Sequence, residues 1–394
     1  KRVSVSGDKS LSIRWVLLAS LADGKSKSFN LLKSDDVIAS IDAIKKLGID
    51  VRLKKDFCEI DGKGLNGYKY KKNIVINAKN SGTLGRLILG LLANCDKKIK
   101  IIGDKSLSKR DFKRVTDPLK KFGIKFKLTN NKNLPLTILG SKNLKPIKYN
   151  ENKGSAQCKS SVIFAGLRTK GTTVVKAKKS RDHTELLCKY LKLPVSLSRK
   201  KNHDLIRIKK AEKIKSLNYN IPSDISSAAF FIVLTCLTEN STLTVKNVNI
   251  NASRIGIIII LRKMGAKIVF RNRRFYKGEL IADIFVKSSK NLRSINCPVK
   301  LNSSSIDEFL LIFLVAAKAK GTSFFKNLSE LNQKESPRLT LGSKILSLMG
   351  IRNKITSSSI KIFGNPQIKI KKKIIIKNYL KDHRIFMSSV IAAL

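Results

Sequence analysis

Apolar residues recur along the chain in six similar segments. Each begins with a turn of polar or small residues and continues as an apolar stretch of helical length, at 6–22, 80–93, 154–167, 222–237, 304–317 and 381–394. Successive starts lie 68 to 82 residues apart, a distance that fits one supersecondary unit. Because apolar residues occupy nearly the whole circumference of these stretches, we expect buried helices.

A second helix is predicted in each of the first five units. It ends in a Gly-type stop and leads into a β-rich segment, at 43–53, 118–128, 190–198, 260–270 and 345–355. Alternating apolar residues at 73–78, 172–177 and 241–248 predict further strands. Each unit is therefore interpreted as β-α-β-α-β-β, with sheets packed outside the helices.

Six such units predict an α/β protein of two domains with three repeats each. The sixth repeat reaches Leu394 without its second helix. We therefore expect the last repeat to be incomplete, as in a truncated chain; completion by the N-terminal strand is the alternative. The length of 394 residues also favours two domains, because one hydrophobic core rarely serves so many residues.

The formal net charge of +54 would by itself suggest nucleic acid, an anionic membrane or acidic small molecules as partners. Lysines are scattered through nearly every segment, so we interpret most of them as solvated residues that reflect a composition bias. The six cysteines show no C-x-x-C spacing, and the apolar runs are far shorter than the ~20 residues of a membrane span. We therefore expect reduced thiols in a cytoplasmic protein without a membrane segment.

The three histidines form no cluster with Cys or Asp at metal-ligand spacing, so we expect neither a metal nor a cofactor. His183 and His383 are expected to orient neighbouring arginines.

Cationic residues gather at the starts of the predicted helices, where unpaired backbone N–H groups and the helix dipole favour phosphate or carboxylate. They are Lys9, Arg14, Arg86, Arg110, Arg181, Lys334, Arg338 and Arg384. At any one helix the polar residues could be ordinary caps. The recurrence over six repeats favours binding of small, strongly anionic substrates.

Seven short motifs occur in one order along the chain: SGDKSLSIR, NSGTLGR, GSAQCKS, SRDHTE, IDEF, KESPRL and DHRIFM. Their order and spacing resemble those of EPSP synthases, especially the branch that includes glyphosate-tolerant bacterial members, over essentially all 394 residues. The resemblance implies a two-domain inverted α/β barrel. It also implies transfer of the enolpyruvyl group of phosphoenolpyruvate to the 5-hydroxyl of shikimate 3-phosphate, with release of phosphate.

We place the crossovers near Gly7 and Pro222, with one domain at 9–221 and the other at 1–8 and 222–394.

The resemblance implies two sets of substrate contacts. Those to shikimate 3-phosphate are Lys9, Ser10, Arg14, Ser155, Ala156, Gln157, Arg181, Asp307 and Lys334. Those to phosphoenolpyruvate are Asn80, Gly82, Thr83, Arg86, Arg110, Gln157, Arg338 and Arg384.

The catalytic residues implied are Asp307 as the base near the 5-hydroxyl, Glu335 as the acid near the methylene carbon, and Lys9. Without the motifs, Asp307 would be interpreted as a cap of the fifth apolar helix. Glu335 would then be a partner of Arg338, three residues later.

The chain departs from the family pattern at several positions. Asn332, Gln333 and Pro337 replace the usual Arg, Val and Asp, so we expect the loop around Lys334 and Glu335 to be rearranged. Asp111 follows Arg110 where the family has Pro, and a lysine that contacts phosphoenolpyruvate in the family would lie beyond Leu394. Gly82 stands where tolerant members carry Ala, which implies competitive inhibition by glyphosate.

Two other functions fit part of the sequence pattern. The related UDP-N-acetylglucosamine enolpyruvyl transferases share the repeat architecture, but their first motif differs and 106–110 lacks their reactive Cys. A basic RNA-binding protein fits the charge, but aromatic residues make up only 6% and no Gly-aromatic stacking motif occurs. We expect a monomer with no specific nucleic-acid partner.

Overall fold

The computed structural model describes residues 1–368, 379–380 and 382–394. The chain divides into two compact units. The N-terminal unit comprises Ser6–Pro222 and Tyr276–Glu279, and the C-terminal unit comprises Lys1–Val5, Ser223–Phe275 and Leu280–Leu394.

The unit boundaries differ slightly from the domain limits drawn from the sequence. Residues 6–8 belong to the N-terminal unit, because Asp8 caps its first helix and the Asp8 N–H donates to the Pro222 carbonyl (2.8 Å). The turn Tyr276–Glu279 also belongs to this unit. Its Tyr276 hydroxyl accepts from the Asn220 N–H at 3.0 Å, and its ring stacks on Tyr219.

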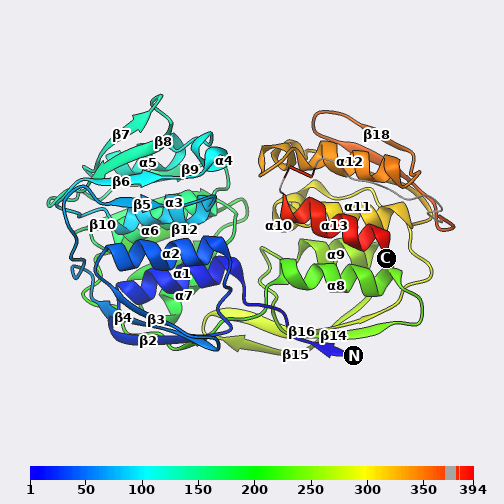
Figure 1. Ribbon diagram of the computed structural model, residues 1–394, viewed down its shortest axis with the longest axis horizontal. Coiled ribbons are helices and arrows are strands. Elements are labelled where there is room, and N and C mark those ends of the chain that lie inside the picture. Colours follow the sequence, from blue (N-terminus) through cyan, green and yellow to red (C-terminus); the bar gives the residue numbers. More distant parts are fainter. Residues whose placement is uncertain (369–378, 381) are drawn as a thin grey trace. The chain divides into compact units, whose positions relative to one another are not determined.

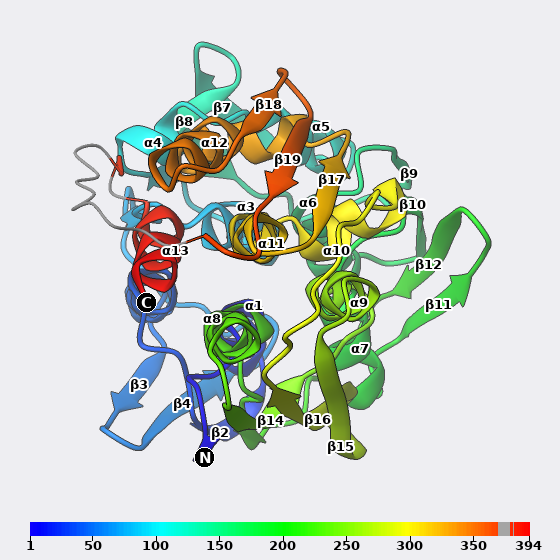
Figure 2. The ribbon, with the colours of Figure 1, turned by 90° about the vertical axis from the view of Figure 1, so that its right-hand side faces the viewer.

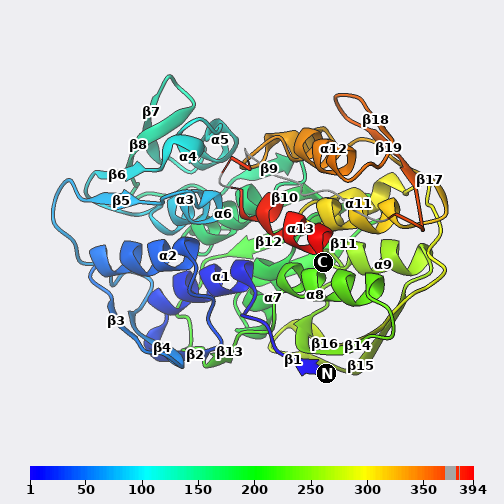
Figure 3. The ribbon, with the colours of Figure 1, turned by 45° about the vertical axis from the view of Figure 1, so that its right-hand side comes forward.

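The helices of the N-terminal unit are α1 (Lys9–Ser20), α2 (Asp35–Lys46), α3 (Gly82–Leu91), α4 (Lys105–Ser108), α5 (Lys113–Lys120), α6 (Ala156–Gly166) and α7 (His183–Tyr190). The unit has three sheets of four strands. The first has the order β13 (Tyr219–Asn220), β2 (Asp23–Phe29), β4 (Phe57–Lys63), β3 (Asp50–Leu53), and the second has the order β5 (Val75–Asn77), β6 (Ile99–Ile102), β8 (Asn133–Leu139), β7 (Lys125–Thr129). The third has the order β11 (Val195–Arg199), β12 (His203–Lys209), β10 (Thr172–Lys178), β9 (Lys148–Glu151). Figures 1 and 3 show α1, α2 and α3 between the first two of these sheets.

These three sheets share one topology. In each, a short edge strand pairs in parallel with the strand that precedes the second helix, and two antiparallel pairings complete the sheet. The edge strand of the first sheet is β13, from the end of the unit, so the unit closes on itself.

The C-terminal unit contains α8 (Ile225–Leu237), α9 (Gly256–Lys263), α10 (Asn302–Ser305), α11 (Phe309–Ala317), α12 (Arg338–Leu348), α13 (His383–Ala393) and the 3-10 turns η1 (Val299–Leu301) and η2 (Ser329–Gln333). Its sheets have the orders β1 (Arg2–Val3)-β14 (Thr242–Asn249)-β16 (Glu279–Lys287)-β15 (Lys267–Tyr276) and β17 (Gly321–Phe325)-β19 (Ile360–Gly364)-β18 (Asn353–Ile355). The N-terminal strand β1 therefore completes the sheet of the fourth repeat. In Figure 2, α8, α9 and α11 are seen nearly end-on, with the strands outside them.

The burial pattern explains this layering. All nine residues of α11 and the stretch from Leu11 to Ser20 in α1 are buried, so these helices form the cores of their units. The outer strands bury every second residue, as in β4 and β8, because one face packs on helices and the other faces solvent. The mixed α/β fold predicted from the sequence is confirmed. No helix in the described residues is long and apolar enough to cross a membrane.

Candidate active site

The first helix of each repeat in the N-terminal unit starts at a side-chain cap. Asp8, Ser81 and Ser155 accept from the backbone N–H groups of Leu11, Leu84 and Cys158 at 2.9, 3.2 and 3.3 Å. The caps hold one N–H group in each first turn and leave others without an intrahelical partner. Ser10, Ser155 and Ala156 lie at these starts and are partly exposed, so ordinary capping does not prevent these starts from binding an anion.

Arg14 is buried within the N-terminal unit and serves as a crosslink between helices. Its guanidinium donates to Thr184 Oγ1 (2.7 Å), to the Ser10 carbonyl (3.0 Å) and to Ser160 Oγ (3.3 Å). Burial lowers the pKa of Arg14 to about 10, against the attraction of Glu185 and Asp8. Arg14 thus ties the starts of α1 and α7 to α6 while remaining a cation.

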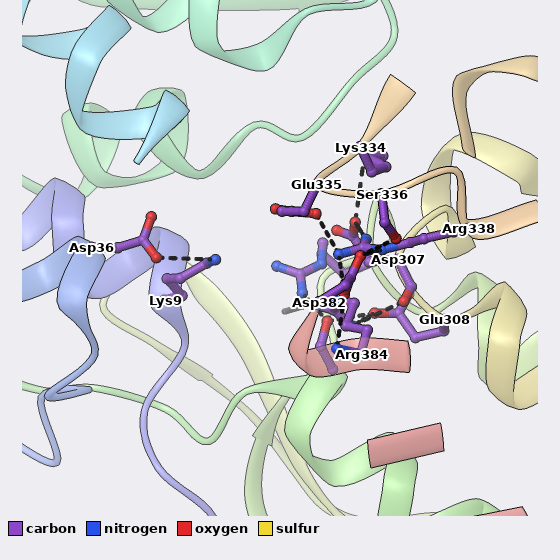
Figure 4. A network of polar contacts seen from close by, with 12 residues as sticks. Lys9, Asp36, Asp307, Glu308, Lys334, Glu335, Ser336, Arg338, Asp382 and Arg384 are labelled. Atoms are coloured by element: carbon purple, nitrogen blue, oxygen red, sulfur yellow. Dashed lines mark hydrogen bonds and ion pairs between the residues drawn. The ribbon is translucent and has the colours of Figure 1, made fainter. Parts of the chain in front are cut away.

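Lys9 is partly exposed, and its ammonium lies 3.5 Å from Asp36 Oδ2 in the first turn of α2 (Figure 4). Arg181 is partly exposed immediately before α7, and its charge acts on Arg14. The cations predicted at α1 and α7 therefore belong to one neighbourhood of the N-terminal unit.

A second neighbourhood in the N-terminal unit surrounds Gly82. Arg86 Nη1 donates to Gln157 Oε1 at 2.6 Å, and Gln157 Nε2 donates to Thr83 Oγ1 at 3.1 Å. A methyl group placed on Gly82 would lie 2.9 Å from Arg86 Nη1 and 3.1 Å from Arg110 Nη1. Glycine at this position therefore lets the helix start approach two guanidinium groups closely.

The arginines around Gly82 carry charge that few protein groups compensate. Burial, with smaller contributions from the charges of Arg110 and Arg114, lowers the pKa of Arg86 to about 10. Arg110 Nη2 is buried without a hydrogen-bond partner among the described residues. Such a cluster of cations favours an anionic ligand. Asn80, two residues before Gly82, is exposed.

The C-terminal unit holds the predicted carboxylates, at the starts of α11 and α12 (Figure 4). Asp307 Oδ1 lies 3.6 Å from Lys334 Nζ and 3.7 Å from Arg338 Nη1. Arg338 Nη2 also donates to Glu335 Oε2. Glu335 does pair with the residue three positions later, whereas Asp307 does not cap α11, whose N-cap is Glu308.

Asp382, which sequence reasoning missed, organises this group from the N-cap of α13. It accepts from Arg338 Nε (2.9 Å) and Arg338 Nη2 (3.2 Å), from Ser336 Oγ (2.7 Å) and from the Arg384 backbone N–H (2.9 Å). Burial alone would raise the pKa of Asp382, but the bonds from Arg338 and Ser336 outweigh burial and lower the pKa. The only signal in the sequence was its place in the motif DHRIFM.

Arg384 reaches back from α13 to the start of α11. Its Nη1 donates to the Asp307 carbonyl at 2.9 Å and lies 3.7 Å from Glu308 Oε1. The structure thus brings Asp307, Lys334, Glu335, Arg338 and Arg384 together within one unit.

One of the residues that depart from the family pattern connects the loop around Lys334 to α12. Asn332 Oδ1 accepts from the N–H groups of Leu339 (3.0 Å) and Thr340 (3.3 Å), so it caps the start of α12, where Pro337 cannot donate. In the same loop, Lys334 pairs with Asp307 and Glu335 pairs with Arg338. The expected rearrangement of this loop relative to the family stays a prediction.

Two buried polar contacts elsewhere in the N-terminal unit were also missed. His183 Nδ1 lies 2.7 Å from Glu279 Oε1, and Lys159 Nζ lies 2.6 Å from Glu185 Oε1. The interpretation of His183 as an orienter of arginine is therefore wrong, since its partner is a carboxylate 96 residues away. All six cysteines are buried and form no disulfide. The described residues contain no group of His, Cys, Asp or Glu suited to a metal ion.

Comparison with known proteins gives a consistent result. The sequence profile of the family described as EPSP synthase (3-phosphoshikimate 1-carboxyvinyltransferase) matches residues 1–394. The 3-phosphoshikimate 1-carboxyvinyltransferase of Ruthia magnifica is 39% identical over 393 residues, covering 100% of this chain and 88% of the relative. That of Streptococcus mutans is 37% identical, covering 100% of this chain and 90% of the relative.

Solved structures support the same assignment. An EPSP synthase structure from Acinetobacter baumannii superposes with a TM-score of 0.87 at 34% identity, covering 100% of this chain and 88% of that one. The enolpyruvyl transferase NikO from Streptomyces tendae, at 14% identity and a TM-score of 0.73, shares the fold. The chain belongs to the EPSP synthase family, with its two-domain inverted α/β fold.

Proposed function

We propose that this chain transfers the enolpyruvyl group of phosphoenolpyruvate to the 5-hydroxyl of shikimate 3-phosphate and releases phosphate, a step of the shikimate pathway. The observation that carries the proposal is the grouping of Asp307, Lys334, Glu335 and Arg338 at two helix starts. Two carboxylates held by shared cations can divide the proton transfers that this reaction requires.

In the first step, the 5-hydroxyl oxygen attacks C2 of phosphoenolpyruvate while Glu335, in its protonated form, gives a proton to C3. Asp307 receives the proton of the hydroxyl group. The product is a tetrahedral adduct that contains a methyl group. In the second step, Glu335, now a carboxylate, takes a proton from the methyl carbon, and the double bond between C2 and C3 forms again. The bond from C2 to the phosphate oxygen breaks, and the phosphate leaves with the proton that Asp307 received in the first step.

The binding roles follow the two neighbourhoods of the N-terminal unit and the carboxylate group of the C-terminal unit. Shikimate 3-phosphate would be held by residues at helix starts, namely Lys9, Ser10, Ser155, Ala156, Gln157 and Arg181. Arg14 would help to position this group through its hydrogen bond to the Ser10 carbonyl. Lys334 and Asp307 would contact the shikimate ring. Lys9 would also act in catalysis as a positive charge that offsets the developing negative charge.

The phosphoenolpyruvate contacts are the residues around Gly82 together with two arginines of the C-terminal unit. Asn80, Gly82, Thr83, Arg86, Arg110 and Gln157 form the first group, and Arg338 and Arg384 the second. Arg110 Nη2, buried and without a partner among the described residues, supports this assignment because an anion would satisfy it.

Phosphate release is the direct test. We expect it only when shikimate 3-phosphate and phosphoenolpyruvate are both present. Release with UDP-N-acetylglucosamine in place of shikimate 3-phosphate would instead favour the related transferase activity. No release with either acceptor would contradict the proposal.

We also propose that the protein is a cytoplasmic monomer whose functional domains divide near Gly7 and Pro222. Sedimentation equilibrium would test the monomer, with a mass near 43.9 kDa expected for this chain. A mass twice as large would contradict it.

A further inference from the structure

We infer that Glu308 is a positioning residue for Arg384, and that its buried carboxylate sets the orientation in which Arg384 meets the anionic substrate. This inference rests on the proposed role of Arg384 in binding phosphoenolpyruvate. Nothing in the reaction itself requires a carboxylate at 308, which makes its contacts informative.

Glu308 occupies an unusual place for a charged residue. It is the N-cap of α11, a helix whose nine residues are all buried, yet its side chain makes no capping hydrogen bond. Glu308 is only 1% exposed. Because a buried carboxylate is costly unless it is paired, its partners determine its role.

The partners of Glu308 come from two other helices. Glu308 Oε1 accepts from Ser226 Oγ in the first turn of α8 and lies 3.7 Å from Arg384 Nη1 on α13. Ser226 Oγ in turn accepts from Arg254 Nη2 at 2.8 Å. Glu308 therefore links the starts of three helices, and Arg384 is the member of this link that belongs to the proposed site.

One nitrogen of Arg384, Nη1, contacts both Asp307 and Glu308. Nη1 donates to the Asp307 carbonyl at 2.9 Å and faces Glu308. Arg384 Nε and Nη2 make no hydrogen bond with the described residues, in contrast to Arg338, whose Nε and Nη2 donate to Asp382 and Glu335. Fixing Nη1 therefore leaves the rest of the Arg384 guanidinium for an anion.

The electrostatics agree with this geometry. Burial raises the pKa of Glu308, and the charge of Arg384 is the strongest influence that opposes the rise. Glu308 Oε2 is buried without a hydrogen-bond partner among the described residues. The Glu308 carboxylate therefore contacts both Arg384 and Ser226 through its Oε1 atom.

The test compares Glu308→Gln, which keeps size and removes charge, with Glu308→Asp, which keeps charge and withdraws it by one methylene. We expect both variants to raise the KM for phosphoenolpyruvate about tenfold and to change the KM for shikimate 3-phosphate less than about twofold. Asp283→Asn is the matched control, because Asp283 is a buried carboxylate paired with Lys246 (2.5 Å) on the sheet of the same unit. It should lower stability without changing the ratio of the two KM values.

A double-mutant comparison shows whether the effect passes through Arg384. On an Arg384→Ala background, Glu308→Gln should change the KM for phosphoenolpyruvate less than about twofold. Equal, multiplicative effects on both backgrounds would overturn the inference, as would a Glu308→Gln enzyme with both KM values unchanged.

A crystal structure of the Glu308→Gln variant gives a readout that does not depend on activity. Arg384 Nη1 should leave the Asp307 carbonyl, and retention of that bond would overturn the inference. If the unaltered protein releases no phosphate with either acceptor, the proposed function fails, and this structure still decides whether Glu308 positions Arg384. Should Glu308→Gln not fold, the Glu308→Asp variant serves for both measurements.

Discussion

Arg338 and Asp382, 44 residues apart, form a bidentate ion pair in which Nε and Nη2 of the arginine lie 2.9 and 3.2 Å from the two carboxylate oxygens. Both residues are 1% exposed. The pair joins the start of α12 to the start of α13, and Glu335 and Asp307 contact the same guanidinium. The proposed catalytic carboxylates are thus held by an arginine that a third carboxylate fixes.

Asp382→Asn should lower the free energy of unfolding by about 3 kcal/mol near neutral pH, because it leaves the buried Arg338 without its main partner. The pKa of Asp382 is lowered in the folded protein, so its stabilising contribution is complete above the unfolded pKa of about 3.9 and is lost as the pH falls further. Urea unfolding from pH 7 to pH 3 would measure both effects. A difference between the unaltered protein and the variant that stays constant over this range would contradict the linkage.

Asp307→Asn and Glu335→Gln each preserve size and remove a proton-exchanging group. Both should reduce the turnover number at least ~10²-fold. Substrate affinity should change much less, although the loss of charge beside Arg338 will alter it somewhat. Steady-state kinetics with binding titrations separate the two effects, and near-normal turnover in either variant would remove that residue from the mechanism.

Gly82→Ala should discriminate between phosphoenolpyruvate and glyphosate. We expect the unaltered enzyme to be inhibited by glyphosate in competition with phosphoenolpyruvate, because the missing Cβ leaves room beside Arg86 and Arg110. The added methyl group would lie 2.9 Å from Arg86 Nη1 and 3.1 Å from Arg110 Nη1, so it must displace guanidinium groups or exclude the longer ligand. The inhibitor should be weakened by ~1–3 kcal/mol more than the substrate.

The inhibition constant and the KM for phosphoenolpyruvate, measured in both proteins, give this comparison. Equal weakening of both ligands, or an unaltered enzyme that is already insensitive, would show that the space beside Gly82 does not select between them.

Asn332→Ala should remove the cap of α12, because the Asn332 side chain accepts from the Leu339 and Thr340 N–H groups. We expect a loss of about 1 kcal/mol in the free energy of unfolding. Asn332→Asp keeps an acceptor at the same place and should retain most of the stability. Thermal unfolding of the two variants tests this, and equal losses in both would mean that the side-chain oxygen does not cap the helix.

Much of the fold is determined by local pattern. The six apolar segments contain α1, α3, α6, α8, α11 and α13. The first five are largely buried, as expected of helices with apolar residues on every side. For α13 the expectation of burial is wrong, because only Ile385 and Ser388 of this helix are buried, while Phe386 and Val390 are exposed. Polar residues at the helix starts could be ordinary caps on sequence grounds, and Asp8, Ser81 and Ser155 do cap their helices, because a cap acts within its own first turn. Ordered motifs identified the family, because seven matches at consistent spacing rarely arise by chance.

The pairings between residues far apart in the sequence could not be derived in this way. Glu308 with Arg384, Arg86 with Gln157 and His183 with Glu279 join residues 71 to 96 positions apart. Sequence separation carries no information about which termini meet, since that depends on how the helices pack and on which side chains the core then buries. The cap that Asn332 supplies to α12 from outside the helix shows the same limit, because it depends on where the preceding turn lies. Only the tertiary structure decided which charges are shared, because a buried charge must find its partner wherever the fold places one.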